Sequence, residues 1–170
     1  MSLRTLQARW TLDRIAPERV HEAATDLLCA GVDTPAVVEL AGMTHAAYFQ
    51  IGPVLERAVA EAGLGAMTRE QALWHLAYEA ARRIADGAVA PRDGAATLRR
   101  LCHDLDMPVP LRSFVYLAAE YGAGPGDRAS EEAWFDARIR ETATDLLAAM
   151  PPDGESAPRE PAAPGAAPGA

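Results

Sequence analysis

The chain has 170 residues, of which 49% are apolar and 24% charged, and its net charge is −8, with 24 acidic against 16 basic residues. This size and composition predict a globular protein with a hydrophobic core, and they argue against a disordered or fibrous chain. The acidic balance disfavours nucleic acid as a partner, because phosphate binding needs clustered Lys and Arg. The longest basic runs are only the pairs Arg82-Arg83 and Arg99-Arg100.

Seven helices are predicted in chain order from apolar spacing and from the positions of proline and glycine. They cover about residues 17–30, 35–42, 53–62, 68–86, 91–105, 110–121 and the segment that begins at Ser130. No segment shows the alternating pattern of a strand. Whether Met1 to Leu12 adds another helix, through Leu3, Leu6 and Trp10, stays open.

Start and stop signals support several of these bounds. Pro17 suits the first position of a helix, and Gly31 suits a left-handed cap at the end of the same helix. Thr68 and Gln71 form a capping-box pattern, in which each side chain can pair with an amide at the helix start. Gly122 to Asp127 is expected to be a loop.

The C-terminal segment differs in composition from the rest of the chain. Residues 151–170 contain six prolines and six alanines but no Val, Ile, Leu or aromatic residue. Ordering each residue costs about 1 to 2 kcal/mol in backbone entropy, and this segment has no large apolar side chain to offset that cost. We therefore predict an all-α protein, a single compact bundle of about seven helices over residues 1–150, followed by a disordered tail over 151–170.

Several runs resemble small helical proteins that are common in GC-rich actinobacteria and have no known activity. They are Asp33-Thr34-Pro35-Ala36, Glu39 to Met43, Arg83 to Gly87 and Pro91 to Ala95. These runs are helix boundaries, so the resemblance implies an all-helical fold over residues 17–149 and implies no catalytic residue or cofactor.

The expected location is cytoplasmic. No window approaches the roughly 18 uninterrupted apolar residues of a membrane span, and the first residues lack the pattern of a secretion signal. The two cysteines, Cys29 and Cys102, are too few and too far apart for a disulfide framework, so both are expected to be reduced thiols. Cys102 falls on the inward face of its helix.

One pair of residues in the sequence has the spacing of metal ligands on a helix. His75 and Glu79 are one helical turn apart, but a zinc site needs at least three protein ligands, and His103 could join them only through folding. A solvated, ion-paired helix face shared with Arg82 and Asp86 explains the pair without a metal ion. Phosphate-binding loops, dinucleotide fingerprints and nucleophile motifs are absent, so we expect no cofactor and no catalytic residue.

Two aromatic patterns bear on partner binding. Trp74 and Tyr78 lie on a second apolar stripe of their helix, which either packs inside the domain or faces a partner. Trp134 falls among Arg138, Glu141 and Asp145, opposite the apolar stripe of the last helix. It could lie under the loop before that helix, stack on Arg138, or anchor a partner.

The expected function is therefore that of a non-catalytic interaction or regulatory module that binds another protein through an acidic and aromatic helix face. A basic partner fits the charge, and an immunity-type protein that neutralises a basic toxin or nuclease is a sharper version. The alternative is a small metal-binding protein or enzyme that uses His75, Glu79 and His103.

Overall fold

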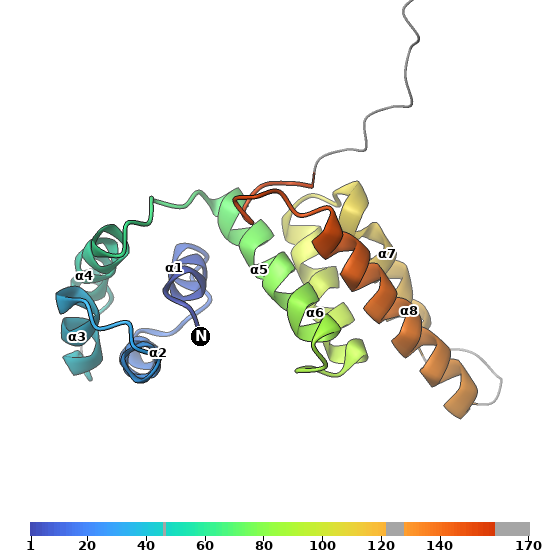
Figure 1. Cartoon of the computed structure of the whole chain (residues 1–170), viewed down its shortest axis with the longest axis horizontal. Helices are drawn as coiled ribbons and strands as arrows, with labels where there is room; N and C mark the ends of the chain where they lie inside the picture. Colours follow the sequence, from blue (N-terminus) through green and yellow to red (C-terminus); the bar gives the residue numbers. More distant parts are fainter. Residues whose placement is uncertain (46, 122–127, 159–170) are drawn as a thin grey trace, which may run out of the picture. The chain divides into compact units, whose positions relative to one another are not determined.

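The computed structural model describes residues 1–45, 47–121 and 128–158, and within this part the chain is all-α, with no strand (Figure 1). This confirms the expected fold class. The helices are α1 (Leu3–Thr11), α2 (Pro17–Cys29), α3 (Pro35–Gly42), α4 (Tyr48–Glu61), α5 (Arg69–Ala85), α6 (Pro91–Asp104), α7 (Val109–Glu120) and α8 (Arg128–Ala148). No helix of the described residues is long and apolar enough to cross a membrane.

The helices belong to two compact units, Met1–Leu76 and Ala77–Ala170, where the sequence analysis expected one bundle. The first unit holds α1 to α4 and the start of α5, and the second holds the rest of α5 with α6 to α8. Each unit buries apolar side chains from its own helices. The candidate sites described below each lie within one unit.

The N-terminal helix α1 answers the question that the sequence left open. The Ser2 side chain accepts a hydrogen bond from the Thr5 amide at 3.1 Å and so caps the helix. Leu3 and Leu6 are buried and belong to the core that α1 shares with α2, α3 and α4, while Trp10 packs against that core and stays partly accessible.

Helix α4 begins at Tyr48 and contains Pro53, although the sequence analysis expected Pro53 to start it. Two contacts support the earlier start. The Gln50 side chain accepts from the Ala47 amide at 2.8 Å, and the Tyr48 ring stacks on Trp10 at 4.2 Å between ring centroids. The expectation was wrong because the cost of Pro53, which removes one helical hydrogen bond and crowds the carbonyl four residues earlier, is offset by such contacts in the first turn.

Helix α5 begins as predicted. The Thr68 amide donates to Gln71 Oε1 at 2.8 Å, and the Gln71 amide donates to Thr68 Oγ1 at 3.2 Å, so the capping box is formed on both sides. After the helix ends at Ala85, Gly87 has φ +71°, a left-handed conformation that glycine adopts without strain.

The second unit contains a close contact between α5 and α6. Gly94 on α6 is buried, and a Cβ at this position would lie 2.3 Å from Ile84 Cγ1 and 2.6 Å from Ile84 Cδ1. Cys102 is buried, which confirms that it lies on the inward face of its helix, and Ala95, Leu98 and Leu101 of α6 are buried as well.

Helix α8 begins at Arg128, so Ser130, where the sequence analysis expected this helix to begin, lies inside its first turn. Acidic residues are favourable throughout the first turn of a helix, so Glu131 and Glu132 did not identify its first residue. The loop predicted over Gly122 to Asp127 lies outside the described residues.

Residues 151–158, which the sequence analysis placed in the tail, pack against the second unit. Pro151 is buried, and the Tyr78 hydroxyl donates to the Ser156 carbonyl at 2.8 Å. Asp153 Oδ1 accepts from the amides of Glu155 and Ser156 at 3.1 and 3.3 Å, which holds this segment in a turn. The rest of the predicted tail, 159–170, lies outside the described part of the chain.

Candidate functional site

The end of α7 and the first turns of α8 enclose a cavity of about 490 Å³, which we call the α7–α8 cleft. It is lined by Glu120, Ser130, Glu131, Trp134 and Phe135. Ser130, Glu131, Trp134 and Phe135 lie on one side of α8, because residues three or four positions apart are neighbours on the surface of a helix. Glu120 is the last residue of α7.

Aromatic rings form one wall of the α7–α8 cleft. The Trp134 side chain is 59% exposed, and its ring meets Phe135 edge to face at 4.9 Å and 84°. Phe135 in turn lies 5.5 Å from the Tyr121 ring. An exposed tryptophan held by a second ring presents a large apolar surface in a defined orientation.

The charge on the cleft is negative, because Glu120 and Glu131 line it and no cationic side chain of the described residues does. Behind the rings, the Tyr121 hydroxyl donates to Asp136 Oδ1 at 2.9 Å. Burial raises the pKa of Tyr121, and this hydrogen bond raises it further. The Arg92 guanidinium lies 5.4 Å from the centre of the Tyr121 ring.

The outer face of α8 continues the negative surface away from the cleft. Trp134, Arg138, Glu141 and Asp145 are all exposed, on the side of α8 opposite the buried Ile139. Arg138 Nη1 lies 2.5 Å from Glu141 Oε2, so these two side chains form an ion pair. The aromatic ring that Trp134 contacts is that of Phe135.

Trp74 and Tyr78, the other tentative partner-binding residues, do not form a surface. Each is only 2% exposed, so the second apolar stripe of α5 is packed inside the protein, as one of the two interpretations from sequence proposed. The hydroxyl of Tyr78 is also bonded to Ser156. The two residues are therefore not part of the candidate partner-binding surface.

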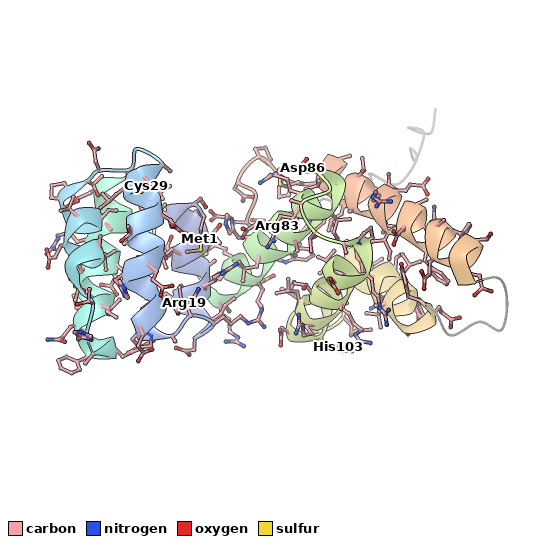
Figure 2. The ribbon with its side chains drawn as sticks, turned by 90° about the horizontal axis from the view of Figure 1, so that it is seen from below. Met1, Arg19, Cys29, Arg83, Asp86 and His103 are labelled. Atoms are coloured by element: carbon pink, nitrogen blue, oxygen red, sulfur yellow. The ribbon has the colours of Figure 1, made fainter. Side chains whose placement is uncertain are left out.

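The groups considered for metal binding are not assembled into a site. Among the described residues, no three His, Cys, Asp or Glu side chains are placed to hold a metal ion. His75 Nε2 lies 3.2 Å from the Thr5 hydroxyl, within the first unit. His103 is exposed at the end of α6 (Figure 2).

The cysteines also differ in their surroundings. Cys102 is fully buried, and burial raises the pKa of its thiol, which opposes formation of the nucleophilic thiolate. Cys29 lies at the end of α2 and is exposed (Figure 2).

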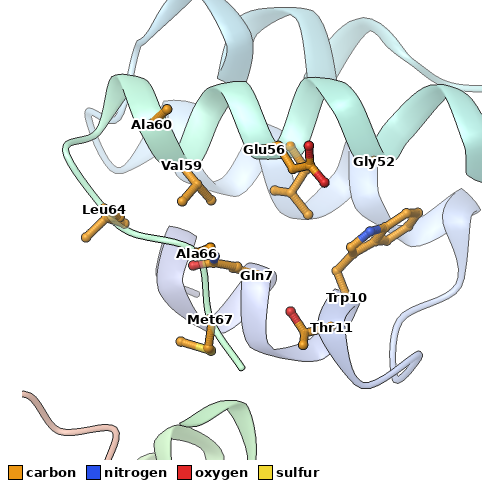
Figure 3. A pocket seen from close by; sticks show the side chains of 11 residues that line it. Gln7, Trp10, Thr11, Gly52, Glu56, Val59, Ala60, Leu64, Ala66 and Met67 are labelled. Atoms are coloured by element: carbon orange, nitrogen blue, oxygen red, sulfur yellow. The ribbon is translucent and has the colours of Figure 1, made fainter. Parts of the chain in front are cut away.

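A second concave site lies in the first unit, and sequence reasoning missed it. We call it the α1–α4 groove: a cavity of about 390 Å³ between α1, α4 and the linker that follows α4 (Figure 3). It is lined by Gln7, Trp10, Thr11, Gly52, Leu55, Glu56, Val59, Ala60, Leu64, Ala66 and Met67. The three α1 residues share one helix face, but only folding shows that this face meets α4.

Comparison of the chain with protein-family models, with curated proteins and with solved structures finds no match.

Proposed function

We propose that the protein is a non-catalytic interaction module that binds a basic segment of another protein through the α7–α8 cleft and the adjoining outer face of α8. One observation carries this proposal. An exposed tryptophan stands in a cavity whose charged lining residues, Glu120 and Glu131, are carboxylates.

This combination suits an arginine or lysine side chain. A cation over an indole ring is stabilised by about 0.5 to 1 kcal/mol at an exposed site, and by more when water is displaced. The carboxylates of Glu120 and Glu131, which line the same cavity, add charge complementarity, while an acidic partner would be repelled. Glu141 and Asp145 extend the negative surface along α8, which would steer a basic segment toward the cleft.

The first test uses a defined probe. An end-blocked glycine pentapeptide with a central arginine is titrated into isotopically labelled protein, and the same peptide with a central glutamine serves as its uncharged control. The arginine peptide should shift the indole N–H signal of Trp134 and the amide signals of residues 130–135. The glutamine peptide should shift them much less, and equal shifts with both peptides would contradict the proposal.

The second test asks whether a protein partner depends on the same surface. Trp134→Ala should weaken capture of the partner by about 30-fold, the equivalent of about 2 kcal/mol for an aromatic hot spot. The matched control is Tyr116→Ala, since Tyr116 is an aromatic residue of the same unit that is 68% exposed and does not line the cleft. Equal loss of the partner in both variants would argue for a different surface.

A further inference from the structure

We propose that the α1–α4 groove binds a small organic cation, meaning an amine carried by an apolar body. This inference concerns the first unit and does not depend on the proposed function of the α7–α8 cleft. The volume of the α1–α4 groove, about 390 Å³, falls within the range of roughly 300 to 1,000 Å³ that is typical of small-molecule pockets.

The floor of the α1–α4 groove is apolar. Leu55 and Val59 come from α4, and Leu64 and Met67 come from the linker between α4 and α5. Leu55, Val59 and Met67 are themselves buried, so their contact with the cavity is a small patch that a ligand could cover. Such a floor favours a ligand with a hydrocarbon or aromatic portion.

One wall is an indole ring held in a fixed orientation. Trp10 stacks on Tyr48 with an angle of 16° between the ring planes, and the Tyr48 hydroxyl donates to Asp13 Oδ1 at 2.9 Å. Gly52 faces the indole from α4, and a Cβ there would lie 4.0 Å from Nε1 and Cζ2 of the ring. Because glycine has no side chain, this edge of the indole is left open to the groove (Figure 3).

The linker wall is held to α1 by polar contacts. The Gly65 carbonyl accepts from Arg4 Nη1 at 2.6 Å and from Gln7 Nε2 at 3.2 Å, and Arg4 Nη1 also donates to Gln7 Oε1 at 2.7 Å. Gln7 is only 8% exposed, so these bonds satisfy an amide that would be costly to bury alone. The groove is therefore formed before a ligand arrives, and the Arg4 guanidinium is not among its lining groups.

The sign of the ligand charge follows from Glu56. Its carboxylate lines the groove on the side where Trp10 lies (Figure 3). Among the described residues, no cationic side chain forms an ion pair with Glu56. The neighbouring Arg57 pairs with Glu39 and Glu61 instead. A carboxylate beside an indole attracts an ammonium group by charge and by cation–π interaction, and it repels an anion.

The test compares ligands that share one body and differ in charge. The probes are 3-phenylpropylamine, 3-phenylpropan-1-ol and 3-phenylpropionate, each titrated into labelled full-length protein that carries Trp134→Ala, so that the α7–α8 cleft loses its main aromatic anchor. The amine should shift the indole N–H signal of Trp10 and the amides of the groove, with an affinity at least about tenfold above that of the alcohol. The propionate should bind more weakly than the alcohol.

A charge-removing variant tests the role assigned to Glu56. Glu56→Gln keeps the shape of the side chain and should lower the affinity for the amine several-fold, without changing the affinity for the alcohol. The smaller preference for the amine that remains is the part due to the cation–π interaction with Trp10. The matched control is Glu18→Gln, an exposed glutamate on α2 that does not line the groove and should leave all affinities unchanged.

Three results would overturn the inference. They are equal affinities for amine and alcohol, an amine preference that is undiminished in Glu56→Gln, and chemical-shift changes that map outside the groove. Glu56 is exposed, so this variant should fold, and its amide spectrum reports folding in the same experiment.

Discussion

At the scale of single residues, Gly94 is the position where the packing leaves least room. Ile84, which faces it, is fully buried and β-branched, so its side chain cannot easily turn away from an added methyl group. The Val89 Cγ1 atom, 3.4 Å from the position of the missing Cβ, closes another side. The helices α5 and α6 can approach this closely only because residue 94 is a glycine.

Gly94→Ala should therefore lower the free energy of unfolding by about 1 to 3 kcal/mol, the usual cost of overpacking a core. This loss opposes the roughly 1 kcal/mol by which alanine favours a helix over glycine. Urea denaturation followed by circular dichroism measures the change. Gly52→Ala in α4 is the matched control, because its Cβ would make only ordinary contacts at 4.0 Å, and it should be neutral or stabilising. A Gly94→Ala variant as stable as the wild type would refute the close approach.

At the scale of elements, α5 has residues in both compact units, and residues 151–158 pack against it. Apolar residues cover much of the surface of α5, and the burial of both of its apolar stripes, including Trp74 and Tyr78, explains this pattern. In the second unit, Tyr78 is bonded to Ser156, and Arg82 Nη2 lies 4.0 Å from Met150 Sδ. Residues 151–158 thus contribute to the packing of α5 although they contain no large apolar side chain.

A chain that ends at Met150 should be less stable than one that ends at Pro158, by about 1 to 3 kcal/mol, because it loses the Tyr78 hydrogen bond and the burial of Pro151. Thermal and urea unfolding of the two chains give this difference. Tyr78→Phe made in both chains completes a double-mutant cycle. It should cost stability in the longer chain and little in the shorter one, and equal stability of the two unmutated chains would disprove the packing of this segment.

At the scale of the whole molecule, stability should depend on alkaline pH. The structure raises the pKa of Tyr48, mainly through its hydrogen bond to Asp13, and the pKa of Tyr78 and Tyr121, mainly through burial. Tyr78 shows the largest shift, because its hydroxyl lies inside the protein near Asp153. An unfolded chain releases these protons near pH 10, whereas the folded chain still holds them. The folded state then binds more protons, so the free energy of unfolding falls as pH rises above about 10.

Tyr78→Phe should make this alkaline decline shallower, because phenylalanine has no proton to release. The variant should be less stable than the wild type at pH 8, owing to the lost hydrogen bond, and the gap should narrow toward pH 11. Urea unfolding at a series of pH values measures both effects. Parallel curves for the two proteins would show that Tyr78 titrates alike in the folded and unfolded chains.

Part of the candidate site could be predicted because it depends on helix periodicity alone. Trp134, Arg138, Glu141 and Asp145 share the exposed side of α8 wherever that helix packs, since its buried stripe faces the other way. Glu120 could not be placed beside Trp134 in this way, because it belongs to another helix. The same limit applies to Glu56 and Trp10 in the first unit, which are 46 residues apart in the printed sequence.

Caps, prolines and apolar spacing act over a few neighbouring residues, so the helical fold and most helix bounds can be predicted from the sequence alone. The division of the helices into two units and the start of α4 at Tyr48 depend on contacts between distant residues. The same holds for the packing of residues 151–158 on α5 and for the positions of the two cavities. An amphipathic stripe shows that a helix has an inward face, but the partner of that face is chosen by contacts between residues distant in the chain.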